Sequence, residues 1–139
     1  MNTKSVQLLE NKLTAEDFIR LKVATGFAER PLLQVQKALE NGLYNVSAVC
    51  DGMVVGMGRL VGDGALYWYL QEIVVLPDYQ GMGIGRQIVS HLLEYIRNNA
   101  IHGTQICIGL TSVAGKEPFY EKFGFVRKAT GMAQWLQIE

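Results

Sequence analysis

One face of a long segment near the middle of the chain is consistently apolar. From position 84 onward, apolar residues recur every four positions, at Ile84, Ile88, Leu92 and Ile96. This spacing is typical of an amphipathic helix that packs one stripe of side chains against a sheet. We therefore expect a helix of several turns to begin at Ile84.

The segment before this helix is rich in β-branched and aromatic residues instead, which favours strands. It divides into three runs, 44–50, 53–61 and 66–76. Asp51 and Gly52 separate the first two runs, and such a pair supplies a two-residue hairpin turn. We expect two strands joined by a tight turn, followed by a long third strand.

Shorter elements are predicted on either side of this central part. An edge strand over 6–9 precedes two short helices, the first of which begins with a capping box at Thr14. After the long helix we expect a strand over 105–110, a short helix over 116–122 and a closing pair of strands that ends with 133–138. The order β-α-α-β-β-β-α-β-α-β-β indicates a mixed α+β sheet rather than an alternating parallel one.

The chain is short and balanced in charge, which narrows the classes of protein to which it can belong. Its 139 residues suit a single domain, predicted to span 1–139. The 49% of hydrophobic residues exclude a disordered chain. With 13 basic and 13 acidic residues, a general nucleic-acid binder and a polybasic membrane-surface protein are disfavoured. No apolar signal region and no run of about 20 apolar residues occurs, which predicts a cytoplasmic protein.

The two cysteines and two histidines carry no recognisable motif. Cys50 and Cys107 lie in separate apolar stretches, and we expect both to be reduced, buried thiols. Two cysteines are too few for a disulfide framework in a chain this short. His91 and His102 are isolated from the cysteines and from each other, so no metal site is expected.

Glycines alternate in the loop that leads from the third predicted strand into the long helix, at Gly81, Gly83 and Gly85. Glycine lets a backbone approach a ligand closely, and the free amides at a helix start bind phosphate. A dinucleotide fingerprint would need glycine where Arg86 stands, and no P-loop sequence is present. The residues alone leave two alternatives, a phosphate site and a tight strand-to-helix connection.

Two motifs in this chain resemble the signature of the GNAT superfamily of acyl-CoA-dependent N-acetyltransferases. The family pattern Gln/Arg-x-x-Gly-x-Gly/Ala is matched by Gln80, Gly83 and Gly85. A second family motif, Phe-Tyr-Glu-Lys-Phe-Gly-Phe, is complete at 119–125. Many members carry Asn seven residues before the tyrosine, where this chain has Val113, so one side-chain contact to the cofactor is not carried over.

The resemblance implies both a fold and a cofactor. The fold would be a mixed, mostly antiparallel sheet of about six or seven strands, flanked by four helices and splayed open between its fourth and fifth strands. The pantetheine arm of acetyl-CoA would pair with Ile73, Val74 and Val75, and an amide near Val74 would face the thioester carbonyl. The pyrophosphate would lie on the amides of Gln80, Gly81, Met82, Gly83, Ile84, Gly85 and Arg86. No metal is implied.

Acetyl transfer requires a neutral amine, a stabilised oxyanion and a proton for the departing thiolate. Tyr120 matches the family's general acid; alternatively, its ring packs under the sheet. Glu72 is the sole carboxylate in the run 66–76 and is the candidate base. Half-burial would raise its pKa and suit it to that role; alternatively, it is a solvated charge on the polar face of the strand.

The sequence says less about the amine that would accept the acetyl group. Tyr67 and Tyr69 share one face of their strand and would line an acceptor pocket or pack in a core or interface. Glu29, in the break between the first two helices, would attract a cationic amine, and His102 is expected to be solvated. We predict transfer of an acetyl group from acetyl-CoA to a primary amine of a small molecule or protein, without a nucleic-acid or membrane partner. The alternative is a non-catalytic acyl-CoA sensor on the same fold, and the resemblance also allows a homodimer.

Overall fold

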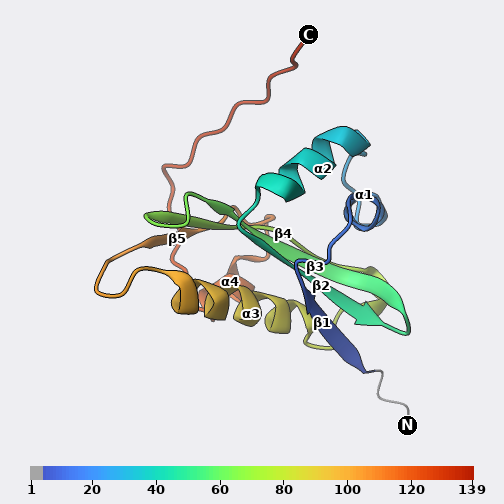
Figure 1. The fold of residues 1–139 in the computed structure, drawn as a ribbon, viewed down its shortest axis with the longest axis horizontal. Coiled ribbons are helices and arrows are strands. Elements are labelled where there is room, and N and C mark those ends of the chain that lie inside the picture. Colours follow the sequence, from blue (N-terminus) through green and yellow to red (C-terminus); the bar gives the residue numbers. More distant parts are fainter. Residues whose placement is uncertain (1–4) are drawn as a thin grey trace.

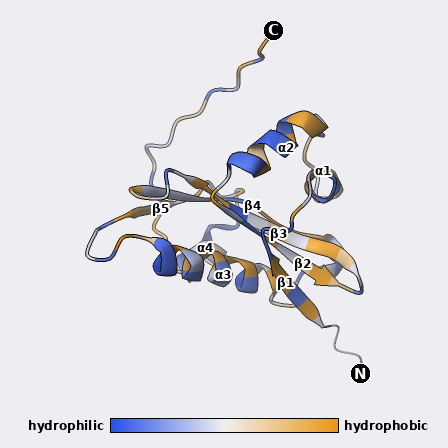
Figure 2. Ribbon diagram, viewed as in Figure 1, coloured by the Kyte–Doolittle hydropathy of each residue, from blue (hydrophilic) through white to orange (hydrophobic). Residues whose placement is uncertain are grey.

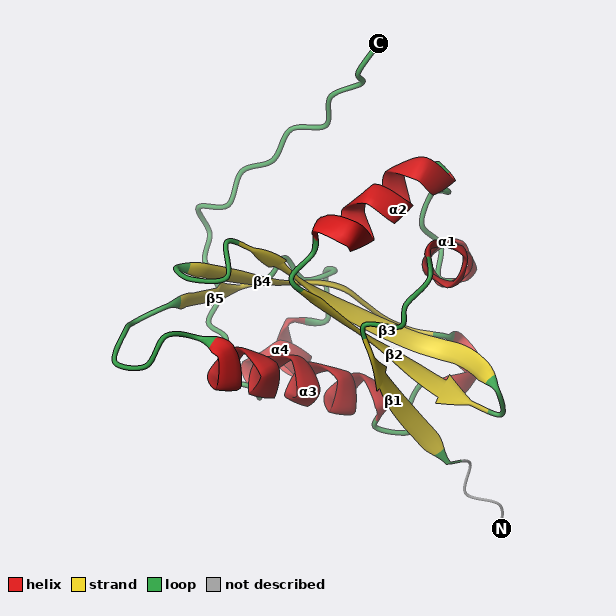
Figure 3. Ribbon diagram, viewed as in Figure 1, coloured by secondary structure: helices red, strands yellow, loops and turns green. Residues whose placement is uncertain are grey.

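In the computed structural model, which describes residues 5–139, one sheet separates two pairs of helices (Figure 1). Helices α1 and α2 lie on one face of the sheet, and α3 and α4 lie on the other (Figure 3). The elements, in chain order, are β1 (Val6–Glu10), α1 (Ala15–Ala24), α2 (Leu32–Asn41), β2 (Tyr44–Cys50), β3 (Met53–Gly62), β4 (Tyr67–Val75), the 3₁₀ turn η1 (Pro77–Tyr79), α3 (Ile84–Asn99), β5 (Cys107–Gly109) and α4 (Glu117–Glu121).

The five strands lie in the order in which they occur along the chain. Strands β1 to β4 pair antiparallel with their neighbours, whereas β5 pairs parallel to β4. A parallel pair needs a crossover connection, and α3 supplies it. Asp51 and Gly52 have φ values of 52° and 77°, the left-handed conformation that a tight hairpin turn requires. The mixed α+β class and the predicted hairpin are therefore confirmed.

Helix α3 packs very closely on β3, because β3 presents glycines to it. The predicted apolar stripe of α3 is buried, and its turns alternate between hydrophobic and hydrophilic colour in Figure 2. A Cβ atom added at Gly58 would lie 2.6 Å from a methyl group of Ile88 and 2.8 Å from one of Ile73. The absence of a side chain at Gly58 thus sets the distance between helix and sheet. No helix in residues 5–139 has the length and hydropathy that a bilayer crossing requires.

Helices α1 and α2 cover the opposite face with a smaller apolar cluster. Phe18 and Leu21 of α1 pack with Val35 of α2 against Met57 and Val74 of the sheet. The start of α1 is stabilised as predicted, since the Thr14 hydroxyl accepts a hydrogen bond of 3.1 Å from the backbone N–H of Asp17. This cluster fixes α1 and α2 over the middle of β3 and β4.

The predicted closing pair of strands is wrong. The segment 126–139 forms no strand and runs away from the sheet as an extended trace (Figure 1). Met132 and Trp135 are 98% and 86% exposed, and the Trp135 ring centroid lies 5.8 Å from the Arg30 guanidinium carbon. Strand propensity specifies a side-chain pattern but not a pairing partner, and β5 has only three residues of edge to offer. The described sheet therefore has five strands rather than six or seven.

The prediction that both cysteines are buried holds for one of them. Cys50 is 1% exposed within the main core, whereas Cys107 is exposed. Cys107 lies at the start of β5, where the sheet ends. An apolar sequence neighbourhood does not bury a residue on an edge strand whose outer side is uncovered.

Replacing Gly58 with alanine should destabilise the protein by about 1–3 kcal/mol, the usual cost of inserting a methyl group into a packed core. The new Cβ atom would press on Ile88, Ile73 and Leu92 at once. Urea unfolding measures the change, and Gly131→Ala is the control, because no atom lies within 4 Å of a Cβ at that position. Equal stability of the two variants would contradict the close packing of α3 on β3.

Candidate active site

Strands β4 and β5 separate after a short stretch of pairing. They pair at three positions, from Tyr67 with Cys107 to Tyr69 with Gly109. The aromatic ring of Tyr69 lies over the end of β5, where a Cβ on Gly109 would come within 2.6 Å of it. Beyond this point, no described strand pairs with Leu70–Val75 on the edge that faces β5. The end of pairing at this point agrees with the opening that the family resemblance implies between the fourth and fifth strands.

A bulge in β4 changes which side chains face each side of the sheet. Glu72 and Ile73 lie opposite the single residue Gly58 of β3. Before the bulge, Leu70 packs toward α3; after it, Ile73 does so, and Val74 joins the cluster under α1. Simple alternation would direct Glu72 toward α3 together with Leu70. The bulge directs its side chain toward α1 instead.

The backbone of Glu72 is strained. Its φ angle is 59°, a left-handed conformation that costs a non-glycine residue about 1–2 kcal/mol. Such strain persists only where the surroundings hold it in place, and it is concentrated at functional sites. The bulge is therefore a candidate functional feature.

The Glu72 carboxylate has a fixed partner. Its Oε2 atom lies 2.7 Å from the Lys22 Nζ atom of α1, and the two side chains are only 17% and 19% exposed. The prediction that Glu72 is half-buried is confirmed, and the alternative of a solvated charge is wrong. The ion pair holds the carboxylate on the α1 side of the opening.

A cavity of about 230 Å³ lies beside this ion pair. Its walls come from α1, the α1–α2 loop, α2, β3 and β4, through Phe18, Arg30, Gln34, Val35, Ala38, Arg59 and Glu72. The cavity thus combines an apolar wall with three charged side chains, one of them the candidate base.

Arg59 belongs to this site although the sequence motifs did not indicate it. Burial lowers the pKa of its guanidinium, and the charge of Glu72 acts in the opposite direction. Its Nε atom is buried without a hydrogen-bond partner among the described residues. A signal was available in the sequence, because Arg59 is the sole charged residue of β3, and the hairpin register places it opposite Gln71. Lys22 and Arg30 join the site through tertiary packing alone.

The loop that carries Gly81, Gly83 and Gly85, called the glycine loop below, is hydrogen-bonded to the end of β4. The side-chain amide of Gln80 donates a hydrogen bond of 3.0 Å to the Val75 carbonyl. Gly81 and Gly83 both have φ values of 80°, and Gly83 is the N-cap of α3. The first hydrogen bond of the helix runs from the N–H of Gln87 to the Gly83 carbonyl at 3.1 Å, so the amides of residues 84–86 have no helical acceptor.

The Arg86 side chain reaches back over this loop. One of its terminal nitrogens lies 3.9 Å from the point where a Cβ of Gly83 would stand. The loop therefore presents free amides, the positive end of a 16-residue helix and a guanidinium in one place. This combination suits an anion such as a phosphate.

Tyr120 lies on α4, next to the start of α3. The neighbouring Phe119 ring approaches Gly85, where a Cβ would lie 3.6 Å away. The Tyr120 ring makes edge contacts with Phe119 and Phe125, at centroid distances of 5.0 and 6.3 Å. Burial raises the pKa of its phenol, and its hydroxyl has no hydrogen-bond partner within residues 5–139. The ring packs, as one alternative proposed, but the hydroxyl remains protonated and available.

The remaining predicted residues fall in different places. Tyr67 and Tyr69 are 49% and 37% exposed and stack on each other at 6.4 Å, so the core alternative is wrong for them. Glu29 is exposed and does not line the cavity, whereas its neighbour Arg30 does. His102 is exposed, as predicted.

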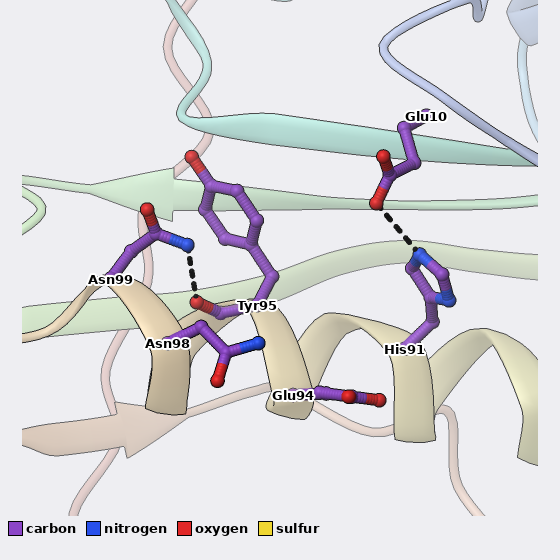
Figure 4. A pocket seen from close by; sticks show the side chains of 6 residues that line it. All are labelled: Glu10, His91, Glu94, Tyr95, Asn98 and Asn99. Carbon is purple, nitrogen blue, oxygen red and sulfur yellow. Dashed lines mark hydrogen bonds and ion pairs between the residues drawn. The ribbon is translucent and has the colours of Figure 1, made fainter.

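A second hollow, of about 290 Å³, lies along the C-terminal half of α3 and away from the glycine loop (Figure 4). His91 and Glu10 approach to 3.0 Å across it, and the Tyr44 hydroxyl donates a 2.6 Å hydrogen bond to Glu10. Both contacts lower the pKa of Glu10, and the hydrogen bond from Tyr44 has the larger effect. They tie β1 to α3 and are structural. No group of three or more potential metal ligands occurs among the described residues.

Comparison with known protein families gives one match over more than half of the chain. Residues 42–127 match the model described as "Acetyltransferase (GNAT) domain". The chain is 27% identical over 134 residues to an uncharacterized N-acetyltransferase, ycf52, of Pyropia yezoensis, covering 93% of this chain and 75% of that protein. It is also 28% identical over 104 residues to serotonin N-acetyltransferase 2, chloroplastic, of Oryza sativa subsp. japonica, covering 72% of this chain and 50% of that protein.

Solved structures agree with the family match. A probable acetyltransferase of meticillin-resistant Staphylococcus aureus superimposes with a TM-score of 0.85 at 27% identity, covering 96% of this chain and all of the other (100%). The aminoglycoside N-acetyltransferase AAC(6')-Iy in complex with CoA gives a TM-score of 0.69 at 13% identity, covering 99% and 98% of the two chains. At that level of identity the second likeness concerns the fold alone.

The strained backbone at Glu72 predicts an unusual order of stability. Glu72→Gly and Glu72→Ala both remove the carboxylate and its ion pair, but glycine adopts the left-handed conformation without strain. The glycine variant should therefore be more stable by about 1 kcal/mol. At the adjacent Gln71, whose φ is not positive, the order should reverse. Chemical denaturation of the four variants checks both signs, and an alanine variant that is the more stable at both positions would contradict the strained bulge.

Proposed function

The chain belongs to the GNAT family of acetyltransferases, and on this basis we propose that it acetylates a primary amine across the opening between β4 and β5. The observation that carries the proposal is the unpaired edge of Leu70–Val75, which leads directly into the glycine loop at the start of α3. An extended, amide-containing ligand can pair with such an edge, while its phosphates bind at the helix start. Acetyl-CoA has both of these parts.

The residues around the opening fit such a ligand. The edge of Ile73, Val74 and Val75 would pair with the pantetheine arm, and an amide near Val74 would donate to the thioester oxygen. A donor of this kind contributes about 3–4 kcal/mol when it is aimed at the developing oxyanion. The pyrophosphate would be held by the amides of residues 80–86 and by Arg86.

The acid and the base act from opposite sides of the sheet. Acetyl-CoA supplies the acetyl group as a thioester. Glu72, on the α1 side, accepts a proton from the amine, directly or through a water, as the amine nitrogen attacks the thioester carbon. Tyr120, on the α4 side, gives its proton to the sulfur as the carbon–sulfur bond breaks, and solvent then reprotonates the phenolate. The Tyr120 hydroxyl, which is protonated at neutral pH and has no hydrogen-bond partner among the described residues, supports this role.

Replacing Gly83 with valine should obstruct the phosphate site and strain the loop. For the parent protein, CoA at a hundredfold excess over its Kd should add about 2.7 kcal/mol of stability. The variant should gain little. Gly103→Val is the matched control, because Gly103 has almost the same φ, 81° against 80°, but lies between α3 and β5. Melting temperatures measured with and without CoA separate the effects, and an equal rise in all three proteins would show that the phosphates bind elsewhere.

Tyr120→Phe should reduce kcat by about ten- to a thousandfold, toward the smaller value because a CoA thiolate is a fair leaving group. The ring contacts with Phe119 and Phe125 are kept, so CoA affinity and stability should hardly change. The assay is thiol release from acetyl-CoA with a panel of primary amines, with the product identified by mass.

Tyr95→Phe serves as the control for this variant. Tyr95 is also half-buried, but it lies in the C-terminal half of α3 and stacks on Tyr44. The Tyr95→Phe variant should keep the parent's turnover. Undiminished turnover in Tyr120→Phe would remove the tyrosine from the mechanism, and absence of thiol release from the parent with every amine would contradict the proposed function.

A further inference from the structure

The cavity beside Glu72 carries an excess of positive charge. Its single carboxylate is already compensated, because Glu72 forms its 2.7 Å ion pair with Lys22. Two guanidiniums, those of Arg30 and Arg59, line the same cavity. Within residues 5–139, neither of them has a carboxylate at ion-pair distance. Together with Lys22, the acceptor side of the site therefore has three cations and one carboxylate, an excess of two positive charges, although the charge of Glu72 also acts on Arg59.

Arg59 is the inner cation, and its surroundings satisfy it poorly. One terminal nitrogen lies at the end of α2, 3.5 Å from where a Cβ of Gly42 would be. The negative end of a helix contributes only about half an elementary charge, which cannot balance two guanidiniums. The Nε atom is buried without a partner among the described residues. A buried donor without an acceptor is costly. No guanidinium nitrogen of Arg59 donates a hydrogen bond to a described residue, so its terminal nitrogens are available to an acceptor that enters the cavity.

Arg30 is the outer cation. It lies in the loop between α1 and α2, exposed to solvent, with the Trp135 ring 5.8 Å from its guanidinium carbon. A guanidinium offers two parallel N–H donors that match the oxygens of a carboxylate or a phosphate. Arg59 at the inner end and Arg30 at the mouth can therefore hold one anionic group between them.

We propose that the acceptor is a small primary amine that carries an anionic group, a carboxylate or a phosphate, and that Arg59 and Arg30 bind this group while the amine nitrogen lies at Glu72. The inference rests on the proposed function, since it assumes that the acceptor enters this cavity. The volume of about 230 Å³ is below the roughly 300–1,000 Å³ of pockets for drug-sized ligands, which favours a small molecule over a protein segment. A diamine is disfavoured because its second ammonium would face the two guanidiniums.

The test compares primary amines in which two carbons separate the amine from a variable second group, with acetyl-CoA saturating. These are ethanolamine, O-phosphoethanolamine, β-alanine and ethylenediamine. We expect kcat/KM to be at least about tenfold higher for an anionic amine than for ethanolamine, a difference of about 1.4 kcal/mol. Ethylenediamine should be the poorest. Comparison of O-phosphoethanolamine with β-alanine identifies phosphate or carboxylate as the preferred group.

Substitutions test whether the guanidiniums cause the preference for anionic amines. Arg59→Gln should abolish the advantage of the anionic amines over ethanolamine, while Arg59→Lys should retain part of it. Arg97→Gln, in the last turn of α3, is the control and should behave like the parent. If Arg59→Gln does not fold, Arg30→Gln at the exposed mouth should reduce the same advantage.

The outcomes separate this inference from the proposed function. Equal use of neutral and anionic amines would overturn the inference and leave acetyl transfer intact. If the parent acetylates none of the four amines, binding decides, with melting temperatures recorded in the presence of CoA. Stabilisation by O-phosphoethanolamine or β-alanine, but not by ethanolamine, that disappears in Arg59→Gln supports an anion site. No stabilisation by either anionic amine overturns it.

Discussion

From Leu70 to Val75, β4 is bonded to a neighbouring strand along one edge only, because β5 ends at Gly109, opposite Tyr69. An unpaired edge presents a row of N–H and C=O groups that another extended chain can satisfy. Here the edge lies in the middle of the molecule, between helices on either face, and ends at the glycine loop (Figure 1). The rest of the candidate site is arranged around this edge.

The bulge in β4 divides the proposed chemistry between the two faces of the sheet. It turns Glu72 toward Lys22 and the cavity under α2, while Ile73 remains in the core under α3. Tyr120 packs from α4 on the α3 side. An amine could therefore approach from one face and a thiol leave toward the other, with the unpaired edge between them. The strain at Glu72 is the structural cost of this arrangement.

Local patterns were sufficient to predict much of the fold. The four-residue period of α3, the Asp51–Gly52 turn and the Thr14 cap each depend on residues near one another in the chain, and all three were predicted. The glycine loop and the motif around Tyr120 were recognisable from short stretches as well. The closing strands failed because pairing requires a partner edge, which a local pattern does not specify.

The acceptor side of the site could be predicted only in part. Simple alternation places Glu72 on the wrong face, because the bulge inserts one extra residue into β4. No residue pattern at this position predicts the bulge. Arg59 could have been suspected as the lone charge in β3. Lys22 and Arg30 could not, because packing between α1, α2 and the sheet brings them to Glu72. The charge of the cavity is thus a tertiary property.

Hydrogen exchange of backbone amides, with and without acetyl-CoA, tests the central claim most directly. Amides with no partner in the free protein exchange quickly, and a ligand that binds them slows exchange. We expect exchange to slow at least about tenfold for amides within residues 70–75 and 81–86, with the β1–β2 pair unchanged. Protection confined to other segments, such as the hollow between Glu10 and His91, with none along β4 or the glycine loop, would contradict it.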